Sequence, residues 1–353
     1  MSLQIPIDWL WDVRTGELAE HLSSSAPRLR SLEFYFHSRV CTDGYKYSVP
    51  KNFRLLSQLT SLSITSVNAH IPPEDLASVV QRLSSLQRLA LSFGSFVGQR
   101  QAAADVADSH RRLLISLATS GTHLKELALS PTELASMPPE LAALPGLTRL
   151  QLSGGLTSMP DSVSQLTSLR ELDLLGNWQV PLPEGLASCL HLTRLELTSS
   201  IPNPVLGRLR SLRHLRVLAL PTIYPYWTQL TELRELVLHC RAPGTFECSD
   251  LPAGPYLSRL ESLTLGDLRV FPDNVLENLT AATQLRCLSL PAVLRLTPDD
   301  VAVLCDLPAF SCLRVRDQYS KNQGSWSRLL AQIRAAGSSR GSAITVSLMY
   351  RTT

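Results

Sequence analysis

The sequence predicts an α/β solenoid, a horseshoe in which about twelve short parallel strands form a concave sheet and helices or loops lie on the convex side. Three observations lead to this fold. One short leucine motif recurs along most of the chain, leucine supplies 68 of the 353 residues, and aromatic residues make up only 6%. An interior built from one aliphatic side chain indicates many copies of one packing environment.

The recurring motif is L-x-x-L-x-L, in which Phe, Ile or Val replaces some leucines. Its second half alternates apolar and polar positions, which is typical of a short strand with one buried face. Most starts lie 22 to 30 residues apart, as expected for one strand per repeat. The starts are Leu29, Leu59, Leu86, Leu124, Leu147, Leu169, Leu192, Leu215, Leu233, Leu260, Leu285 and Phe310.

Several segments between the motifs carry helix-start signals, because proline and acidic residues favour the first turn of a helix. They predict helices over 76–83, 275–279 and 301–304. The long interval after Leu86 predicts a further helix from about residue 101 to residue 119. The expected apolar side of that helix holds Val106, Leu113, Leu114 and Leu117.

The two ends of the chain differ from the repeats. We predict an N-terminal helical cap over residues 1–28, the solenoid over 29–318 and a C-terminal cap over 319–353, with a helix at 325–336 and a last strand at 343–349. Caps of this kind hide the apolar edges of terminal repeats. The alternative is that the chain begins inside a repeat of a larger protein, because Trp9 and Trp11 have no preceding unit.

The motif resembles that of the leucine-rich repeat superfamily over residues 29 to about 316. The segment from Leu169 to Leu192 is most similar to the short typical repeat, with Asn177 at the asparagine position and Leu182-Pro183 at the Leu-Pro step. These central repeats resemble plant intracellular Ras-group-related repeat proteins, and the longer outer repeats resemble ribonuclease-inhibitor-like arrays. Related steps occur at Met137-Pro138 and Met159-Pro160.

The asparagine position is not kept in the neighbouring repeats, where Thr132, Gly155 and Ser200 occupy it. An asparagine ladder through the interior, which the resemblance implies, is therefore not expected to be continuous here.

Charged residues recur at the third motif position, which faces away from the core. The order is Arg88, Glu126, Arg149, Glu171 and Arg194. Side chains at equivalent positions of neighbouring strands lie about 4.8 Å apart, so opposite charges become lateral partners. One interpretation is a binding stripe for a protein partner. The other is a self-neutralising ladder that keeps a wide sheet soluble and in register.

Asp173 and Glu196 occupy the fifth motif position in neighbouring repeats, with no cation assigned to either. Like charges without partners cost stability, so these carboxylates are candidates for accepting Arg or Lys from a partner. The alternative is that Arg149 and Arg194 already neutralise them.

A second candidate surface is aromatic. Trp178, Tyr224, Tyr226 and Trp227 fall in predicted loops at the ends of strands. Exposed Trp and Tyr are frequent interface anchors, whereas the alternative interpretation packs them into the loop layer of the solenoid.

No pattern points to catalytic, cofactor-binding or metal-binding residues. Gly337-Ser338-Ser339-Arg340-Gly341 matches G-x-S-x-G, but its predicted neighbours are a helix before and a strand after, the reverse of a nucleophile elbow. The eight His and seven Cys residues lack metal-ligand spacing, and Cys305 and Cys312 are interpreted as small core residues. We therefore expect no enzyme activity and no cofactor.

The net charge of +3 does not indicate a nucleic-acid partner, and no apolar run is long enough for a membrane span. The scattered cysteines and an N-terminus without secretory features favour a reduced, cytoplasmic location.

The resemblance implies a non-catalytic protein–protein interaction module, a scaffold or signalling adaptor, that binds a protein on its concave face or loop edge. Two alternatives stay open at this stage. The chain could be the substrate-recognition part of an F-box-type ubiquitin ligase receptor, if it is truncated, or it could regulate a small GTPase.

Overall fold

The computed structural model describes residues 2–7, 19–37, 52, 55–67, 73–93, 100–119, 123–130, 134–219, 225–239, 251–266, 275–291, 298–317, 331 and 344–350. The backbone divides into two compact units, Met1–Leu192 and Thr193–Thr353, which we call unit 1 and unit 2 and describe separately.

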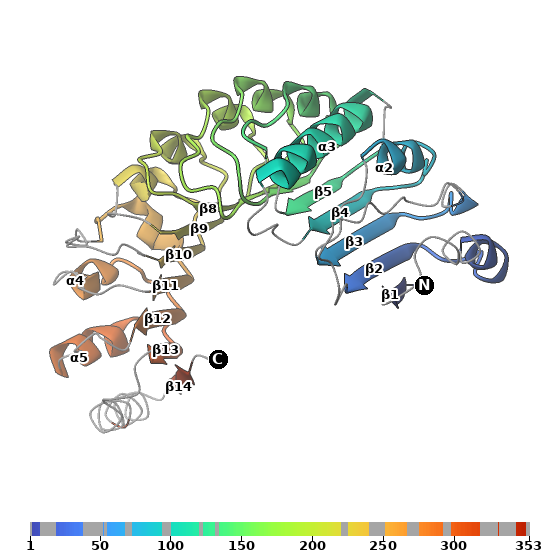
Figure 1. Cartoon of the computed structure of the whole chain (residues 1–353). Helices are drawn as coiled ribbons and strands as arrows, with labels where there is room; N and C mark the ends of the chain where they lie inside the picture. Colours follow the sequence, from blue (N-terminus) through green and yellow to red (C-terminus); the bar gives the residue numbers. More distant parts are fainter. Residues whose placement is uncertain are drawn as a thin grey trace. The chain divides into compact units, whose positions relative to one another are not determined.

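Unit 1 is built on a parallel sheet whose described strands neighbour one another in chain order (Figure 1). Because every strand runs in the same direction, the chain must return from the end of one strand to the start of the next on the outside of the sheet. The strands are β1 (Ser2–Ile7), β2 (Ser31–His37), β3 (Ser61–Val67), β4 (Arg88–Phe93), β5 (Glu126–Ser130), β6 (Arg149–Leu152) and β7 (Glu171–Leu174).

The returning segments of unit 1 form a second layer of helices. Two are α-helices, α2 (Pro73–Val80) and α3 (Arg100–Thr119), which lie on the same side of the sheet in Figure 1. Three are 3-10 helices, η2 (Pro139–Ala143), η3 (Asp161–Gln165) and η4 (Glu184–Ser188). Pro138, Pro160 and Pro183 stand immediately before these three. The steps Met137-Pro138, Met159-Pro160 and Leu182-Pro183 therefore each lead into a 3-10 helix.

Unit 2 repeats the arrangement. Its described strands are β8 (Arg194–Thr198), β9 (His214–Leu218), β10 (Glu235–His239), β11 (Ser262–Gly266), β12 (Cys287–Pro291), β13 (Cys312–Asp317) and β14 (Thr345–Tyr350), and successive strands pair in parallel. The segments between them include η5 (Pro204–Arg208), η6 (Pro225–Gln229), η7 (Pro255–Arg259), α4 (Val275–Leu279) and α5 (Pro298–Asp306).

The motif leucines form the core, and each repeat contributes the same positions. In β6, Leu150 and Leu152 are fully buried while Arg149 is exposed, and the leucine before the strand, Leu147, is also fully buried. Burying one leucine side chain contributes about 1.5–3 kcal/mol, so the stability of the solenoid is spread evenly over its repeats.

A shared backbone contact joins each repeat to the next at the point where the strand begins. The carbonyl of Arg30 accepts hydrogen bonds from the N–H groups of Thr60 and Ser61, at 2.8 and 3.0 Å. The carbonyl of Thr60 accepts in the same way from Gln87 and Arg88. The hydroxyl of Thr60 also donates to the Arg30 carbonyl, at 3.0 Å, so a side chain at the second motif position can strengthen this backbone contact.

The predicted fold class is confirmed, and the helices expected between the motifs are present. Leu113, Leu114 and Leu117 form the buried side of α3, as expected. The described residues hold fourteen strands rather than about twelve, because β1 and β14 extend the sheets. Strand β14 matches the expected last strand, but β1 lies inside the segment predicted as a helical cap, where only residues 19–25 are described as helical. The division into 1–28, 29–318 and 319–353 stays a prediction.

One repeat was placed in the wrong register by the motif. Strand β9 pairs Leu215 with Leu195 of β8 and with Leu236 of β10. The repeat therefore starts at Leu212, as LRHLRV, and not at Leu215. This shift makes His214 and Arg216 face away from the core, because Leu215 and Val217 are the buried pair.

Candidate protein-binding face

The exposed face of the unit 1 sheet carries the predicted row of alternating charges. Arg88, Glu126, Arg149 and Glu171 occupy equivalent positions of β4 to β7 and are register partners in turn. Arg88 donates two hydrogen bonds to the Glu126 carboxylate, at 2.6 and 2.7 Å. Arg149 lies 3.4 Å from Glu171, so these four charges neutralise one another in pairs.

The guanidinium of Arg88 also changes the pKa of Glu126. Its hydrogen bonds hold the pKa of the Glu126 carboxyl below the ordinary value, and partial burial opposes this shift. Two parallel N–H···O bonds are the strongest geometry that an Arg–carboxylate pair adopts. This pair therefore neutralises two charges and is compatible with the register that the backbone ladder of β4 and β5 sets.

Unit 2 carries a denser group of charges on its exposed sheet face. We call Arg194, Glu196, His214, Arg216 and Glu235 the charge cluster. Glu196 accepts from Arg194 and from Arg216, each at 3.3 Å, and Nδ1 of His214 lies 2.9 Å from Glu235. The Glu196 side chain is only 18% exposed, so its charge is held close to the sheet between two more exposed guanidinium groups.

The prediction that Glu196 lacks a cation of its own is wrong. A motif start at Leu215 leaves Arg216 outside the outward-facing motif positions. A start at Leu212 places Arg216 at the fifth motif position, beside Glu196. The start at Leu212 also places His214 at the third motif position. There it lies beside Glu235 of β10, a pair that the motif start at Leu215 does not predict.

Asp173 also has a local partner. Its Oδ1 accepts a hydrogen bond from the backbone N–H of Leu175, at 2.9 Å. This contact closes the turn after β7, so the Asp173 carboxylate has a structural role at the end of its strand. Whether it also contacts another protein stays a prediction.

The aromatic candidates separate into different environments. The Trp178 side chain is 48% exposed in the turn after β7, and Tyr226 is half-buried. Trp227 is completely buried in η6, so its expected role as an exposed anchor is wrong. The bulk of the indole faces the interior, as the alternative interpretation of the loop layer held. Tyr224 lies outside the described residues.

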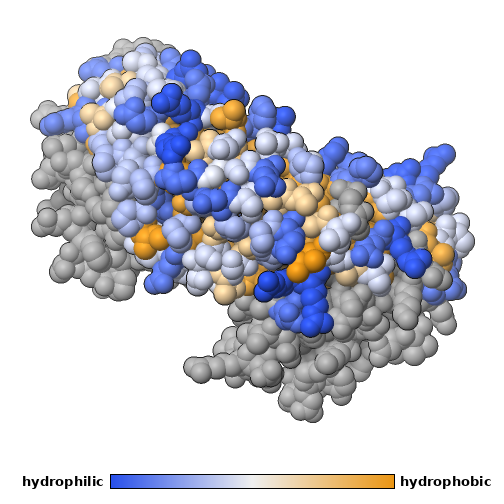
Figure 2. Space-filling view, turned by 90° about the horizontal axis from the view of Figure 1, so that it is seen from above, coloured by the Kyte–Doolittle hydropathy of each residue, from blue (hydrophilic) through white to orange (hydrophobic). Residues whose placement is uncertain are grey.

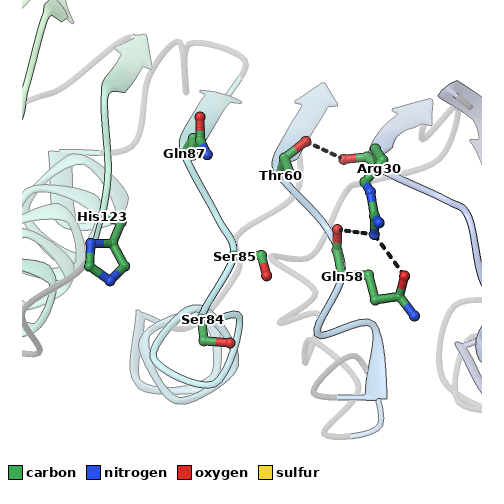
Figure 3. A pocket seen from close by; sticks show the side chains of 7 residues that line it. All are labelled: Arg30, Gln58, Thr60, Ser84, Ser85, Gln87 and His123. Carbon is green, nitrogen blue, oxygen red and sulfur yellow. Dashed lines mark hydrogen bonds between the residues drawn. The ribbon is translucent and has the colours of Figure 1, made fainter.

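A polar hollow lies at the loop edge of unit 1, where β2 to β5 begin. It has a volume of about 460 Å³ and is lined by Arg30, Gln58, Thr60, Ser84, Ser85, Gln87 and His123 (Figure 3). Nη1 of Arg30 donates to the backbone carbonyl and to the side-chain oxygen of Gln58, at 3.1 and 2.7 Å. The guanidinium is thus engaged within the chain, and hydroxyl, amide and imidazole groups form much of the remaining lining.

Large apolar side chains are scattered on the described surface. Those with substantial exposure are Tyr35, Leu55, Trp178 and Leu190. Hydrophilic and hydrophobic residues are interspersed on the face that Figure 2 shows. Charge and hydrogen bonding therefore distinguish the candidate face better than hydrophobicity does.

The described part of the chain was compared with what a metal site and a membrane span each require, and it meets neither requirement. There, no three His, Cys, Asp or Glu side chains gather as a metal site would require. No described helix combines the length and the apolar character needed to cross a membrane.

Comparison with known proteins identifies the family. A family model described as a leucine-rich repeat region matches residues 114–335, which is more than half of the chain. The chain belongs to the leucine-rich repeat family. No curated protein matches this leucine-rich repeat chain.

One of two similar solved structures supports the same fold. A crystal structure of an internalin from Listeria monocytogenes is 18% identical over 88% of this leucine-rich repeat chain and 80% of its own, with a TM-score of 0.50. A leucine-rich repeat protein of Leptospira interrogans is 17% identical over 90% of this chain and 72% of its own, with a TM-score of 0.43. At 18% identity, the internalin shows a shared fold and nothing more.

Proposed function

We propose that this leucine-rich repeat chain is a non-catalytic cytoplasmic scaffold or signalling adaptor that binds a protein partner through the charge cluster of unit 2. The observation that carries the proposal is the position of Glu196 between Arg194 and Arg216 on the exposed face of paired strands. A fixed pattern of alternating charges selects partners with the opposite pattern, because mismatched like charges repel.

The backbone supports such a role. Successive parallel strands hold the cluster in register, so few side chains need ordering when a partner arrives. The pairs on the unit 1 sheet, including Arg149 with Glu171, and the exposed Trp178 extend the candidate surface of that unit. Asp173, Tyr224 and Tyr226 remain secondary candidates. We also propose that the central repeats are related to plant intracellular Ras-group-related repeat proteins and the outer repeats to ribonuclease-inhibitor-like arrays. No described feature favours the ubiquitin-ligase or GTPase alternative.

Affinity purification of the full chain tests the proposal. The informative variants are Arg194→Glu and Arg216→Glu, which reverse the two cations of the charge cluster. Their matched control is Arg259→Glu in η7, away from the sheet face, which breaks an exposed ion pair between Arg259 and Glu232. All variants are checked by circular dichroism and thermal melting, and Arg216→Gln replaces Arg216→Glu if reversal prevents folding.

We expect specific partners of the wild type to bind the cluster variants at least about tenfold more weakly, equivalent to about 1.4 kcal/mol, and to bind the control variant normally. Higher salt should weaken the wild-type complex as well, since exposed charges are screened. Folded cluster variants that recover the wild-type partners at unchanged affinity would refute the proposed face.

A further inference from the structure

Two cysteines lie side by side on the exposed face of the unit 2 sheet. Cys287 of β12 and Cys312 of β13 are direct register partners at the third motif position. The residues that follow them, Leu288 and Leu313, are completely buried, so alternation along each strand turns both thiols away from the core. The interpretation of Cys312 as a core residue is therefore wrong.

The two thiols are in the reduced form, partly exposed and at directly paired positions of neighbouring strands. Neither cysteine takes part in a disulfide, and both side chains are intermediate in burial. Burial raises the pKa of the Cys287 thiol to about 11, and a hydrogen bond with Cys312 contributes to the same shift, whereas the charge of Arg314 opposes it. The direct pairing of β12 with β13 places the two cysteines next to each other before any reaction.

The flanking positions favour sulfur chemistry between these two residues over metal binding. Ser262 lies beside Cys287 on one side, and Thr345 lies beside Cys312 on the other. Hydroxyl groups do not complete a thiolate site for zinc, which requires four nitrogen, sulfur or carboxylate ligands. The pair thus has one evident reaction, which is closure on itself.

The strand geometry permits that closure with strain. Neighbouring strands are about 4.8 Å apart. This spacing lies within the range of about 4.4–6.8 Å between the Cα atoms of a disulfide. The two Cβ atoms point in the same direction, so they are also about 4.8 Å apart, slightly beyond the usual distance of about 3.5–4.5 Å. Closure must draw the strands together, and a strained disulfide is easily reduced again.

We propose that Cys287 and Cys312 form a reversible disulfide site, oxidised by a small-molecule disulfide of the glutathione class, that links two adjacent repeats on the exposed face. The thiolate of one cysteine attacks the small disulfide, forms a mixed disulfide and releases one thiol. The second thiolate attacks the protein sulfur of the mixed disulfide and releases the second thiol. Two protein thiols are oxidised, and one external disulfide is reduced to two thiols.

The position of the pair gives the second step an advantage. Because the second thiol lies at the paired position of the neighbouring strand, closure is intramolecular and competes well with attack by an external thiol. The site does not depend on the proposed binding function, since its residues are separate from the charge cluster.

The test uses the full wild-type chain in buffers of fixed reduced-to-oxidised glutathione ratio at mildly alkaline pH. After acid quenching, free thiols are alkylated, and peptides are mapped by mass spectrometry. We expect a Cys287–Cys312 cross-linked peptide, lighter by two hydrogen atoms, that forms as the buffer becomes more oxidising and disappears when it is made reducing again. Circular dichroism confirms that the chain stays folded.

Two controls make the result specific. Cys287→Ser and Cys312→Ser should each leave a mixed glutathione adduct on the remaining cysteine. Buried Cys189, whose thiol donates to the carbonyl of Val163, should stay unmodified in the folded chain. In unmodified wild type, phenylarsine oxide, which bridges two adjacent thiols, should protect both cysteines from alkylation.

Three results would overturn the proposal. They are mixed adducts without an internal disulfide in folded wild type, a disulfide that joins either residue to another cysteine, or full alkylation of both residues in the presence of phenylarsine oxide.

Discussion

The Asn177 side chain forms hydrogen bonds with several backbone groups at one turn of the leucine-lined interior. Its side chain is buried, and its Nδ2 donates to the carbonyls of Leu152 and Leu174, at 2.6 and 3.0 Å. Its Oδ1 accepts from the backbone N–H of Leu156, at 2.9 Å. One amide therefore satisfies three backbone groups in two consecutive repeats, which water cannot reach.

We expect Asn177→Ala to lower the free energy of unfolding by about 3 kcal/mol. Each buried backbone group that loses its hydrogen-bond partner destabilises the fold by about 1–3 kcal/mol. Urea denaturation followed by circular dichroism measures the change. The matched control is Asn52→Ala, which removes an exposed amide hydrogen bond to Glu20 and should change the stability by less than about 0.5 kcal/mol. Equal stabilities of the two variants would contradict the role assigned to Asn177.

At the scale of the elements, the 3-10 helices of unit 1 stack so closely that one glycine has no room for a side chain. A Cβ atom at Gly185 in η4 would lie 2.3 Å from the backbone oxygen of Asp161 in η3. The N–H of Gly185 also donates to Oδ1 of Asp161, at 3.1 Å. The glycine is thus required by the approach of two backbones, with no need for an unusual backbone conformation.

Gly185→Ala should therefore destabilise the chain by about 1–3 kcal/mol, as overpacking does elsewhere. Gly146→Ala is the matched control, because its added Cβ would lie 3.9 Å from the nearest atom, the carbonyl oxygen of Leu124, in ordinary contact. The melting temperatures of the Gly185→Ala and Gly146→Ala variants, compared with that of the wild type, measure the two effects. A control variant that loses as much stability as Gly185→Ala would show that close approach is not the cause.

The β9 repeat explains why an element could be found by sequence and still be misplaced. The segment L-R-H-L-R-V-L-A-L contains two matches to the motif, one beginning at Leu212 and one at Leu215. Both starts put leucine in the core, so hydrophobic pattern alone does not separate them. Pairing with β8 and β10 does, since Leu215 must lie beside Leu195 and Leu236.

At the scale of the whole molecule, charge balance makes stability depend on acidity. The chain carries 33 Lys and Arg against 30 Asp and Glu. The folded pKa of Glu126 lies below its unfolded value because Arg88 donates to the carboxylate. Its contribution to stability is therefore complete above the unfolded pKa and is lost as the pH falls through the folded pKa.

We expect the free energy of unfolding to decrease between about pH 5 and about pH 3, because carboxylates become neutral while Lys and Arg stay charged and repel one another. Urea midpoints across this range measure the decrease. Arg88→Gln should remove the share due to Glu126, which is less than about 1 kcal/mol because the pair is partly exposed. A midpoint that does not change over this range would contradict the expectation.

The sequence by itself determined the repeating solenoid, its aliphatic core and most helices between the strands. These features follow from local periodicity and from helix-start residues, and each repeat carries its own copy of both signals. It also placed the Arg88–Glu126–Arg149–Glu171 row, because those repeats have a single possible register. The tertiary structure alone decided the register of β9, the burial of Trp227 and the partners of Glu196, whereas the motif already places Cys287 and Cys312 at equivalent positions of consecutive repeats. Each of these depends on which residues of neighbouring strands lie opposite one another or which side of a short helix faces inward. The sequence does not settle such choices. Two strand registers can bury leucine equally well, and a short helix can turn either side inward without backbone strain.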